Sequence, residues 1–292
     1  MTPQPAQLAA LAAVVDHGTF EAAARHLHVT PSAVSQRIRA LESAAGQVLV
    51  RRSAPCRPTE AGESLLRLAR QTELLYAEAA AALSPDEPSA IALPVAVNAD
   101  SLATWFHDVL GAVAGWAGIG LRLLVEDQVY SAGHLRSGDV LAAVTSDPVS
   151  VQGCVLEPLG AQRYVPAAAP AFLERWRHGR SMAWDRMPMV VFHEKDRLQD
   201  EVLEARGASR PPTVHHVPAS HDFVEAVRRG LGWAAVPEQQ LRPFLEDGTL
   251  VALPGRAHVD VPLFWQRWRL DSPALARLSA AVHQAARASL RH

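Results

Sequence analysis

Cysteine is scarce in this 292-residue chain: only Cys56 and Cys154 occur, almost a hundred positions apart and outside any CxxC or Cys/His pattern. This scarcity argues against a disulfide framework and a cysteine-based metal site, and it fits a reducing compartment. The N-terminus has no basic stretch followed by an apolar one, and no run approaches the roughly 20 apolar residues that a membrane span needs. We therefore expect a cytoplasmic protein with no membrane partner.

The common catalytic and nucleotide-binding motifs are missing as well, namely HExxH, GxSxG, GxGxxG and GxxxxGK[ST]. His215 and His216 adjoin, but neighbouring residues of a strand point to opposite faces and cannot share a metal. We expect no enzyme, no metal and no cofactor. An enzyme that uses Asp100, Asp127 and Asp147 for acid–base chemistry stays open as an alternative, because a sensor of a small cation needs carboxylates equally.

The composition is that of an ordinary globular protein, with 49% hydrophobic and 20% charged residues. The formal charge is −2, so any binding of nucleic acid must come from a local concentration of arginine. Residues 1–60 provide one, because six arginines there outnumber four acids. The length suits two or three packed units rather than one.

One shift in composition divides the chain. The run SPDEPSA at residues 84–90 interrupts an Ala/Leu-rich stretch and reads as a hinge linker. The sequence before it is helical, whereas the sequence after it alternates short strands with helices and predicts a parallel sheet. We expect an N-terminal domain at 1–59, a linker helix at 60–83, and a larger C-terminal domain at 91–292.

Residues 19–42, TFEAAARHLHVTPSAVSQRIRALE, predict two helices joined by a tight turn. Thr19 and Thr30 are expected to cap them, with Pro31 at the first position of the second helix. The helical spacing places Val34, Ile38 and Leu41 on one buried side. The opposite side is short, polar and cationic, and it comprises Ser32, Gln36, Arg39 and Ser43, flanked by Ser35 and Arg37.

This polar side suits reading of the DNA major groove, since Gln can bond adenine and Arg can bond guanine. Residues 46–59 follow as a short hairpin, with Val48–Val50 as one strand and Arg51, Arg52 and Arg57 projecting toward phosphates. A helical hairpin with a merely solvated face, or a purely architectural DNA-binding protein, are the alternatives. The predicted contacts to double-stranded DNA are Thr30, Pro31, Ser32, Ser35, Gln36, Arg37, Arg39, Arg51 and Arg52.

Residues 60–83 predict a single long helix whose apolar positions alternate spacings of four and three. Such a seam suits pairing with a second copy of the chain, which would hold two DNA-reading helices about one DNA turn apart. The alternative is that the stripe packs on its own domain. The seam comprises Ala61, Leu65, Leu68, Thr72, Leu75, Ala79 and Ala82.

The run FEAAARHLHVTPSAVSQRIRALE, followed by RPTEAGESLL, resembles the signature of LysR-type transcription regulators, and the resemblance extends over the whole chain. LPVAVNADSLATWF, VED at 125–127 and FVEAVRRGLGWAAVP are similar to the ArgP/LysG subfamily, which controls export of basic amino acids. The resemblance implies an α+β multidomain fold: a winged helix-turn-helix DNA-binding domain at 1–59, a dimerisation helix at 60–83, and a two-lobed α/β effector-binding domain at 91–292 like a type II periplasmic binding protein.

The resemblance also implies partners: a pseudo-palindromic operator, a second copy in a homodimer or tetramer, and RNA polymerase. Many family members carry Gln where this chain has Pro31, so we expect a base contact to be missing there and the operator preference to differ.

The second half predicts a ligand site at strand ends. A strand at 91–97 ends at Asn98, Asp100 and Ser101, with a helix at 102–113, and Ser101 is placed to bind a carboxylate. Strands at 121–125 and 141–144 bring further acids to the same edge. A second lobe at 164–268, with strands at 189–192 and 214–217, faces the first lobe at 91–163 and 269–292 across a hinge.

Ser220 is expected to cap a helix in that second lobe, and a final helix at 273–290 packs back on the first. Hydroxyls, helix N–H groups and carboxylates in one crevice suit a zwitterion with an extra cation, so lysine or arginine is the expected effector. A different small metabolite is the alternative, and any single acid here could be an ordinary strand-end cap. The candidate effector-binding residues are Asn98, Asp100, Ser101, Glu126, Asp127, Ser146, Asp147, His193, Ser220 and His221.

Overall fold

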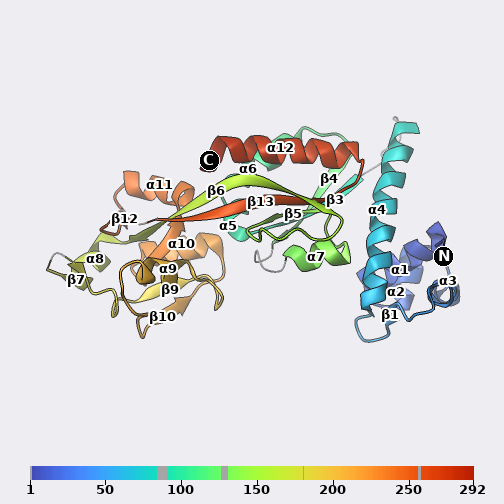
Figure 1. Cartoon of the computed structure of the whole chain (residues 1–292), viewed down its shortest axis with the longest axis horizontal. Helices are drawn as coiled ribbons and strands as arrows, with labels where there is room; N and C mark the ends of the chain where they lie inside the picture. The colour runs from blue at the N-terminus through green and yellow to red at the C-terminus, as the bar shows by residue number, and fades with distance from the viewer. Residues whose placement is uncertain (1, 84–90, 126–130, 180, 256–257) are drawn as a thin grey trace.

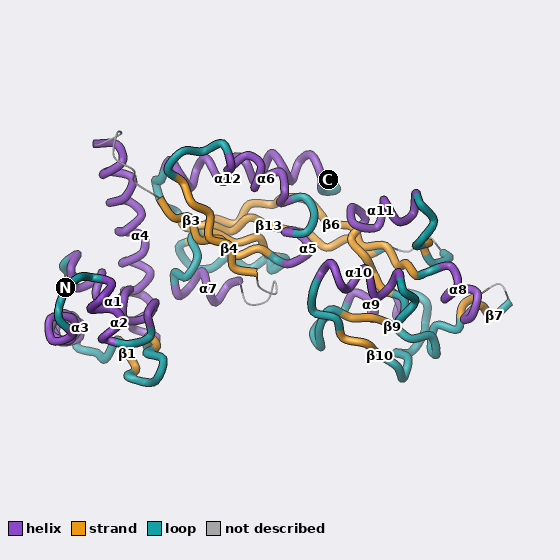
Figure 2. Tube along the Cα trace, turned by 180° about the vertical axis from the view of Figure 1, so that it is seen from behind, coloured by secondary structure: helices purple, strands orange, loops and turns teal. Residues whose placement is uncertain are grey.

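The computed structural model shown in Figure 1 describes residues 2–83, 91–125, 131–179, 181–255 and 258–292. A small helical domain lies at one end, and a long sheet-based domain extends away from it. Helix α4 stands between them, and the second lobe of the sheet-based domain lies farthest from the N-terminal helices in both views (Figures 1 and 2). Within the described ranges, no helix is long and apolar enough to cross a membrane.

The N-terminal domain consists of α1 (Pro5–His17), α2 (Phe20–His26) and α3 (Pro31–Ala45). The threonine caps are confirmed: the Thr19 hydroxyl accepts the backbone N–H of Ala22 at 3.1 Å, and that of Thr30 accepts the N–H of Ala33 at 3.2 Å. The buried side of α3 is confirmed too. Its three members, Val34, Ile38 and Leu41, are completely buried against α1 and α2.

The wing follows as β1 (Val50–Arg51) paired antiparallel with β2 (Arg57–Pro58). The predicted strand at 48–50 was placed too early. The Glu42 carboxylate accepts the backbone N–H of Leu49 at 2.9 Å, so this segment is held by α3 before the ladder begins. Val48 is 64% exposed and contributes no core contact.

Helix α4 (Glu60–Leu83) has the predicted bounds and packs on two different cores. Gly62, Leu66 and Ala69 are buried against the N-terminal domain, and a Cβ on Gly62 would lie 2.0 Å from the Leu49 carbonyl oxygen. Leu74 instead joins the core of the sheet-based domain. Apolar residues of α4 therefore pack on both domains, with those of its first half on the N-terminal core and Leu74 on the other.

The first lobe is built on three parallel strands, β3 (Ile91–Val97), β4 (Ile119–Val125) and β5 (Ala142–Thr145). Helices α6 (Phe106–Ala114) and α12 (Pro273–Ser289) cover one face, and α7 (Ser131–Ser137) lies on the other (Figure 1). Residues of α12 share a core with β3 and α6, which confirms that the final helix packs on the first lobe. These core residues include Leu275, Leu278 and Val282.

The second lobe contains the predicted strands as β9 (Met189–Val191) and β10 (Val214–His216), which pair in parallel. Its remaining elements surround them. They are α8 (Pro170–Trp176), β7 (Arg177–His178), β8 (Ser181–Met182), α9 (Leu198–Glu204), α10 (Ser220–Arg228), β11 (Ala234–Pro237), α11 (Glu238–Glu246) and β12 (Val251–Ala252).

Two long antiparallel strands, β6 (Cys154–Ala168) and β13 (Val259–Trp268), connect the lobes. They make one continuous sheet with strand order β11-β6-β13-β5-β3-β4. Their register shifts between Leu263 and Phe264, beside Gly160 with φ of 120°. The hinge that was expected between the lobes therefore consists of these two strands, and the shift in register lies within their pairing.

The helix predicted at 102–113 is interrupted. The Asn98 side chain accepts the N–H of Ser101 at 2.8 Å and starts a short helix, α5 (Ala99–Leu102), three residues early. The Thr104 hydroxyl then donates to the Asp100 carbonyl at 2.6 Å. Such side-chain bonds compete with helix continuation. Helix α6 begins only at Phe106, and the turn leaves α5 at the edge of the sheet.

Candidate functional site

The predicted DNA-reading side of α3 is open. Ser32, Gln36 and Arg39 are exposed, while Ser35 and Arg37 are partly buried on its flanks. Thr30 serves as the cap and Pro31 is exposed at the first turn. In the wing, Arg51, Arg52 and Arg57 are exposed, and the Arg52 guanidinium lies 5.1 Å from the Phe20 ring centre. Their contacts with DNA stay a prediction, which this exposure permits.

A cleft of about 570 Å³ lies between the two lobes and contains five of the ten predicted effector residues. Helix α5 positions Asn98 and Asp100 at the end of β3, and Ser146 follows β5 in the same way. Parallel strands thus bring their carboxyl ends to one edge, as expected. From the second lobe come His193, after β9, and Ser220, at the start of α10.

Three of the other predicted residues do not line the cleft. Ser101 is completely buried, with its N–H bonded to Asn98 and its hydroxyl 3.4 Å from Gln162. Asp147 caps a turn by accepting the N–H of Val149 at 2.9 Å. His221 is exposed and does not line the cleft. Glu126 and Asp127 lie outside the described residues.

Asp100 is the point where the lobes meet. Its carboxylate accepts the Tyr164 hydroxyl at 2.9 Å and the Ser220 hydroxyl at 3.2 Å. Burial raises the pKa of Asp100 above its ordinary value, with a smaller contribution from Asp196, although the two hydroxyls oppose the shift. The same burial, with the charge of Asp100, raises the pKa of Tyr164. The carboxylate thus has neutral hydrogen-bond partners in a poorly hydrated place.

The expectation that Ser220 caps α10 is wrong. Ala219 occupies the cap position, and Ser220 is the first helical residue. Its hydroxyl donates across the cleft to Asp100 and accepts the Gln240 amide at 3.1 Å. The Ser220 hydroxyl bonds the other lobe instead of a backbone N–H group of its own helix.

Several lining residues were missed from the sequence, among them Tyr164, Lys195, Asp196 and Glu201. Asp196 shapes the loop by accepting the N–H of Phe192 at 2.9 Å and that of Leu198 at 3.1 Å. Lys195 is the only lysine of the chain, and its rarity is the one feature of the sequence that sets it apart. Glu201 is exposed on α9, in the middle of a helix, where no strand-end rule points to it.

Comparison with known proteins agrees with this geometry. Residues 5–63 match the family described as bacterial regulatory helix-turn-helix protein, lysR family, and residues 92–287 match the LysR substrate binding domain. The lysine export transcriptional regulatory protein LysG of Corynebacterium efficiens is 47% identical, covering 98% of this chain and 99% of that one. The regulator ArgP of Aeromonas salmonicida is 38% identical over 90% of both.

Solved structures are equally similar. Full-length LysG of Corynebacterium glutamicum with bound effector Arg gives a TM-score of 0.84 at 43% identity, covering 99% of this chain and 100% of that one. ArgP of Mycobacterium tuberculosis gives 0.90 at 44%, covering 100% and 99%. The expected architecture, a helix-turn-helix joined to a two-lobed effector domain, is confirmed. With both family matches in chain order and relatives of this similarity over nearly the full length, the chain belongs to the LysR family of transcription regulators.

Proposed function

We propose that this protein binds operator DNA and regulates transcription in response to a basic amino acid, lysine or arginine, held in the cleft between its lobes. The observation that carries the effector class is the Asp100 carboxylate. Its hydrogen-bond partners Tyr164 and Ser220 are neutral, and they come from a crossing strand and from the second lobe. The binding free energy of a cationic group is most favourable where it meets a desolvated anion whose other hydrogen-bond donors are neutral.

The other charges of the cleft suit the rest of such a ligand. Asp196 and Glu201 add further acids, while Lys195 and Arg197 add cations that attract a carboxylate. Two relatives support the same class, since one is named for lysine export and the Corynebacterium glutamicum structure carries arginine. By this similarity we infer that the regulated gene encodes an amino-acid exporter.

We infer that the acting form is a homodimer in the cytoplasm, joined through α4. Leu68 and Leu75, on the seam predicted from the heptad spacing, are 39% and 41% exposed in the single chain. The first two seam positions, Ala61 and Leu65, pack partly on the chain's own N-terminal core beside Leu66 and Ala69. Leu68 and Leu75 are left available for a second copy, and a tetramer would use further surfaces. Two α3 helices would then read a pseudo-palindromic operator.

We infer regulation rather than catalysis, because the relatives are transcription regulators. Binding of the effector would favour one arrangement of the lobes and so bias the two DNA-reading helices, which requires different affinities for the two states. RNA polymerase is the expected partner at the promoter.

Titration of the full chain with each of the twenty amino acids, followed by calorimetry, tests the effector class. Lysine or arginine is expected to bind most tightly, because only these carry a permanent side-chain cation beside the zwitterion. Preference for a neutral or acidic compound would refute the assignment and favour another metabolite. Selection from a random duplex library, with and without arginine, tests the DNA half and defines the operator.

A further inference from the structure

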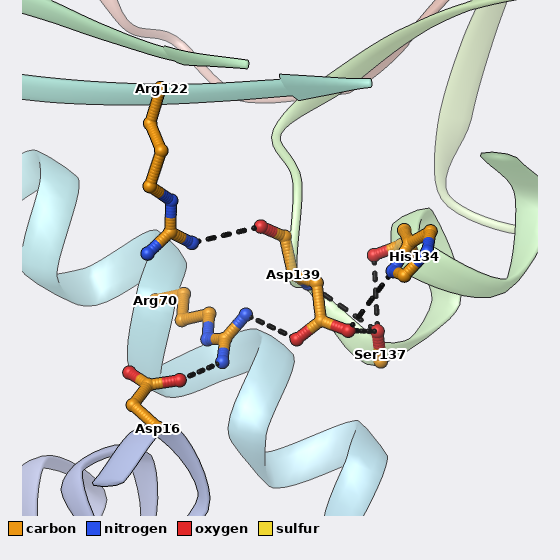
Figure 3. Close-up of polar contacts among 6 residues, drawn as sticks. All are labelled: Asp16, Arg70, Arg122, His134, Ser137 and Asp139. Atoms are coloured by element: carbon orange, nitrogen blue, oxygen red, sulfur yellow. Dashed lines mark hydrogen bonds and ion pairs between the residues drawn. The ribbon is translucent and has the colours of Figure 1, made fainter. Parts of the chain in front are cut away.

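Arg70, near the middle of α4, holds acids from two domains at once (Figure 3). One guanidinium nitrogen donates to Asp139 of the effector domain at 2.6 Å, and another is paired with Asp16 in the last turn of α1. The arginine side chain is only 10% exposed. A planar guanidinium fixes the angle between its two bonds, so the two carboxylates are held in one relative position.

Asp139 is itself anchored within the effector domain. Its second carboxylate oxygen accepts the Ser137 hydroxyl at 2.7 Å and lies 3.3 Å from the His134 ring (Figure 3). Its carbonyl accepts a bond from Arg122 of β4 at 3.3 Å. Burial raises the pKa of Asp139, but the Ser137 bond and the charge of Arg70 outweigh it and lower the pKa below its usual value. The group is therefore a carboxylate fixed to α7 and β4.

A short buried strand connects this anchor to the cleft. Asp139 lies three residues before β5, all four residues of β5 are buried, and Ser146 directly after it lines the cleft. The N–H of Leu141 donates to the carbonyl of Pro94 in β3 at 2.8 Å, and β3 ends at Asn98 and Asp100. Because close-packed strands shift as units, a displacement at the cleft edge reaches Asp139.

A neighbouring arginine offers a contrast. Arg67, one turn earlier on α4, donates to the Arg136 carbonyl at 3.1 Å and lies 4.8 Å from the centre of the Trp268 ring. Both partners belong to the effector domain. Gly138 lets the α7–β5 turn approach α4 closely, since a Cβ there would lie 2.8 Å from the Cα of Arg67. Arg67 thus attaches α4 to one domain, whereas Arg70 connects two.

We propose that Arg70 is the positioning residue that transmits the state of the effector cleft to the DNA-reading domain, through Asp139 on one side and Asp16 on the other. The inference rests on the proposed function, since it assigns a route by which that effector acts. Breaking either ion pair is expected to leave both binding sites intact and to remove this polar connection between them, while the apolar contacts of α4 stay. Substitutions at Asp16, Arg70 and Asp139 are therefore expected to give one common phenotype.

The test uses the full chain with the variants R70Q, D139N and D16N. Operator affinity is measured by fluorescence anisotropy with and without saturating arginine, and arginine affinity is measured separately by calorimetry. Each variant is expected to bind arginine within about twofold of the wild type. The factor by which arginine changes operator affinity should fall to less than a third of the wild-type factor in all three. R70K keeps the positive charge but lacks the planar guanidinium that binds two carboxylates at once. It should show the same loss of coupling while preserving the fold.

R67Q is the matched control, because it removes a contact between the same helix and the same domain. It is expected to keep the wild-type factor. The proposal is overturned if R70Q and R70K retain that factor, or if R67Q loses it to the same degree, since adhesion of α4 alone would then explain the coupling.

An experiment without effector tests the role of Arg70 independently of the proposed function. Should arginine not bind the wild type, the effector assignment fails, and hydrogen–deuterium exchange of the unliganded full chain still decides on the relay. R70Q is expected to raise exchange several-fold both at the Asp16 end of α1 and in the turn at 137–141, and R67Q only in that turn. Unchanged exchange at α1 in R70Q would overturn the relay.

Discussion

Replacing Asp100 by Asn removes one negative charge from the cleft and keeps the shape of the side chain. The amide oxygen can accept the Tyr164 hydroxyl, and the amide nitrogen can donate to the Ser220 oxygen, so both contacts continue. The loss is the charge pair with the cationic effector. Removing one partner of a buried charge pair costs about 2–5 kcal/mol. At about 1.4 kcal/mol per factor of ten, affinity for lysine or arginine should fall about thirtyfold or more.

The raised pKa of Asp100 adds a pH signature. Between the unfolded pKa of about 3.9 and the raised folded pKa, the native chain binds more protons than the unfolded chain. Its stability therefore falls as the pH rises through that window. D100N lacks this titration, so it should lack that part of the slope and be at least as stable as the wild type at neutral pH. Effector affinity of the wild type should decrease as the pH falls through the raised pKa, because the cation needs the ionised form.

Calorimetry of the full chain with arginine, thermal unfolding across pH, and operator binding without effector together measure these effects. The matched control is Asp147→Asn, which changes a neighbouring strand-end acid that only caps a turn and does not line the cleft. It should leave arginine affinity unchanged. The reasoning is refuted if D100N binds arginine as the wild type does, or if D100N weakens DNA binding as much as arginine binding, which would indicate damage to the fold.

Further predictions concern the rest of the chain. Arg52→Ala should weaken binding to every DNA sequence and reduce the slope of log affinity against log salt by about one; an unchanged slope in a salt titration would remove this arginine from the phosphate contacts. Leu75→Asp should shift the dimer toward monomer in analytical ultracentrifugation, because it puts a charge on the exposed seam, and an unaltered mass would place the interface elsewhere. Gly62→Ala should destabilise the N-terminal domain by about 1–3 kcal/mol, since its Cβ would lie 2.0 Å from the Leu49 carbonyl oxygen. Gly111→Ala, on α6 with open space around it, should instead stabilise the protein by about 0.4–1 kcal/mol. Thermal unfolding of the two variants compares them, and equal changes in melting temperature would contradict the close approach at Gly62.

The N-terminal half could be predicted from sequence because its signals are local. Thr30 followed by Pro31 marks a helix start within two residues, and the run from Glu60 to Leu83 has the bounds of α4. Asn98 was predicted to bind the effector; its side-chain oxygen caps α5, and the residue also lines the cleft. A polar residue after a strand can have either role, and the sequence alone does not distinguish them.

The cleft was predictable only where the strand-end rule applies. Asp100 and Ser146 follow parallel strands, so their meeting at one edge follows from topology. Tyr164 reaches the cleft because β6 runs through both lobes. No local sequence pattern indicates which residue of a 15-residue strand lies beside a binding site. Ser220 lies in the cleft as expected, but it does not cap α10, and its hydroxyl instead bonds Asp100, 120 positions away in the chain.

The way α4 is shared explains why a polar relay can set the position of the DNA-reading domain. Gly62, Leu66 and Ala69 fix the helix to one core and Leu74 fixes it to the other, so apolar packing holds α4 in both domains. Packed cores are bistable rather than continuously deformable, and the apolar contacts of this helix do not depend on the charge state of the cleft. The Arg70 pairs are directional and join α1 to the turn before β5, so a small shift of that turn changes their energy first. The ion pairs of Arg70 therefore determine which of two arrangements of the domains is favoured, while the apolar contacts restrict the domains to a few arrangements.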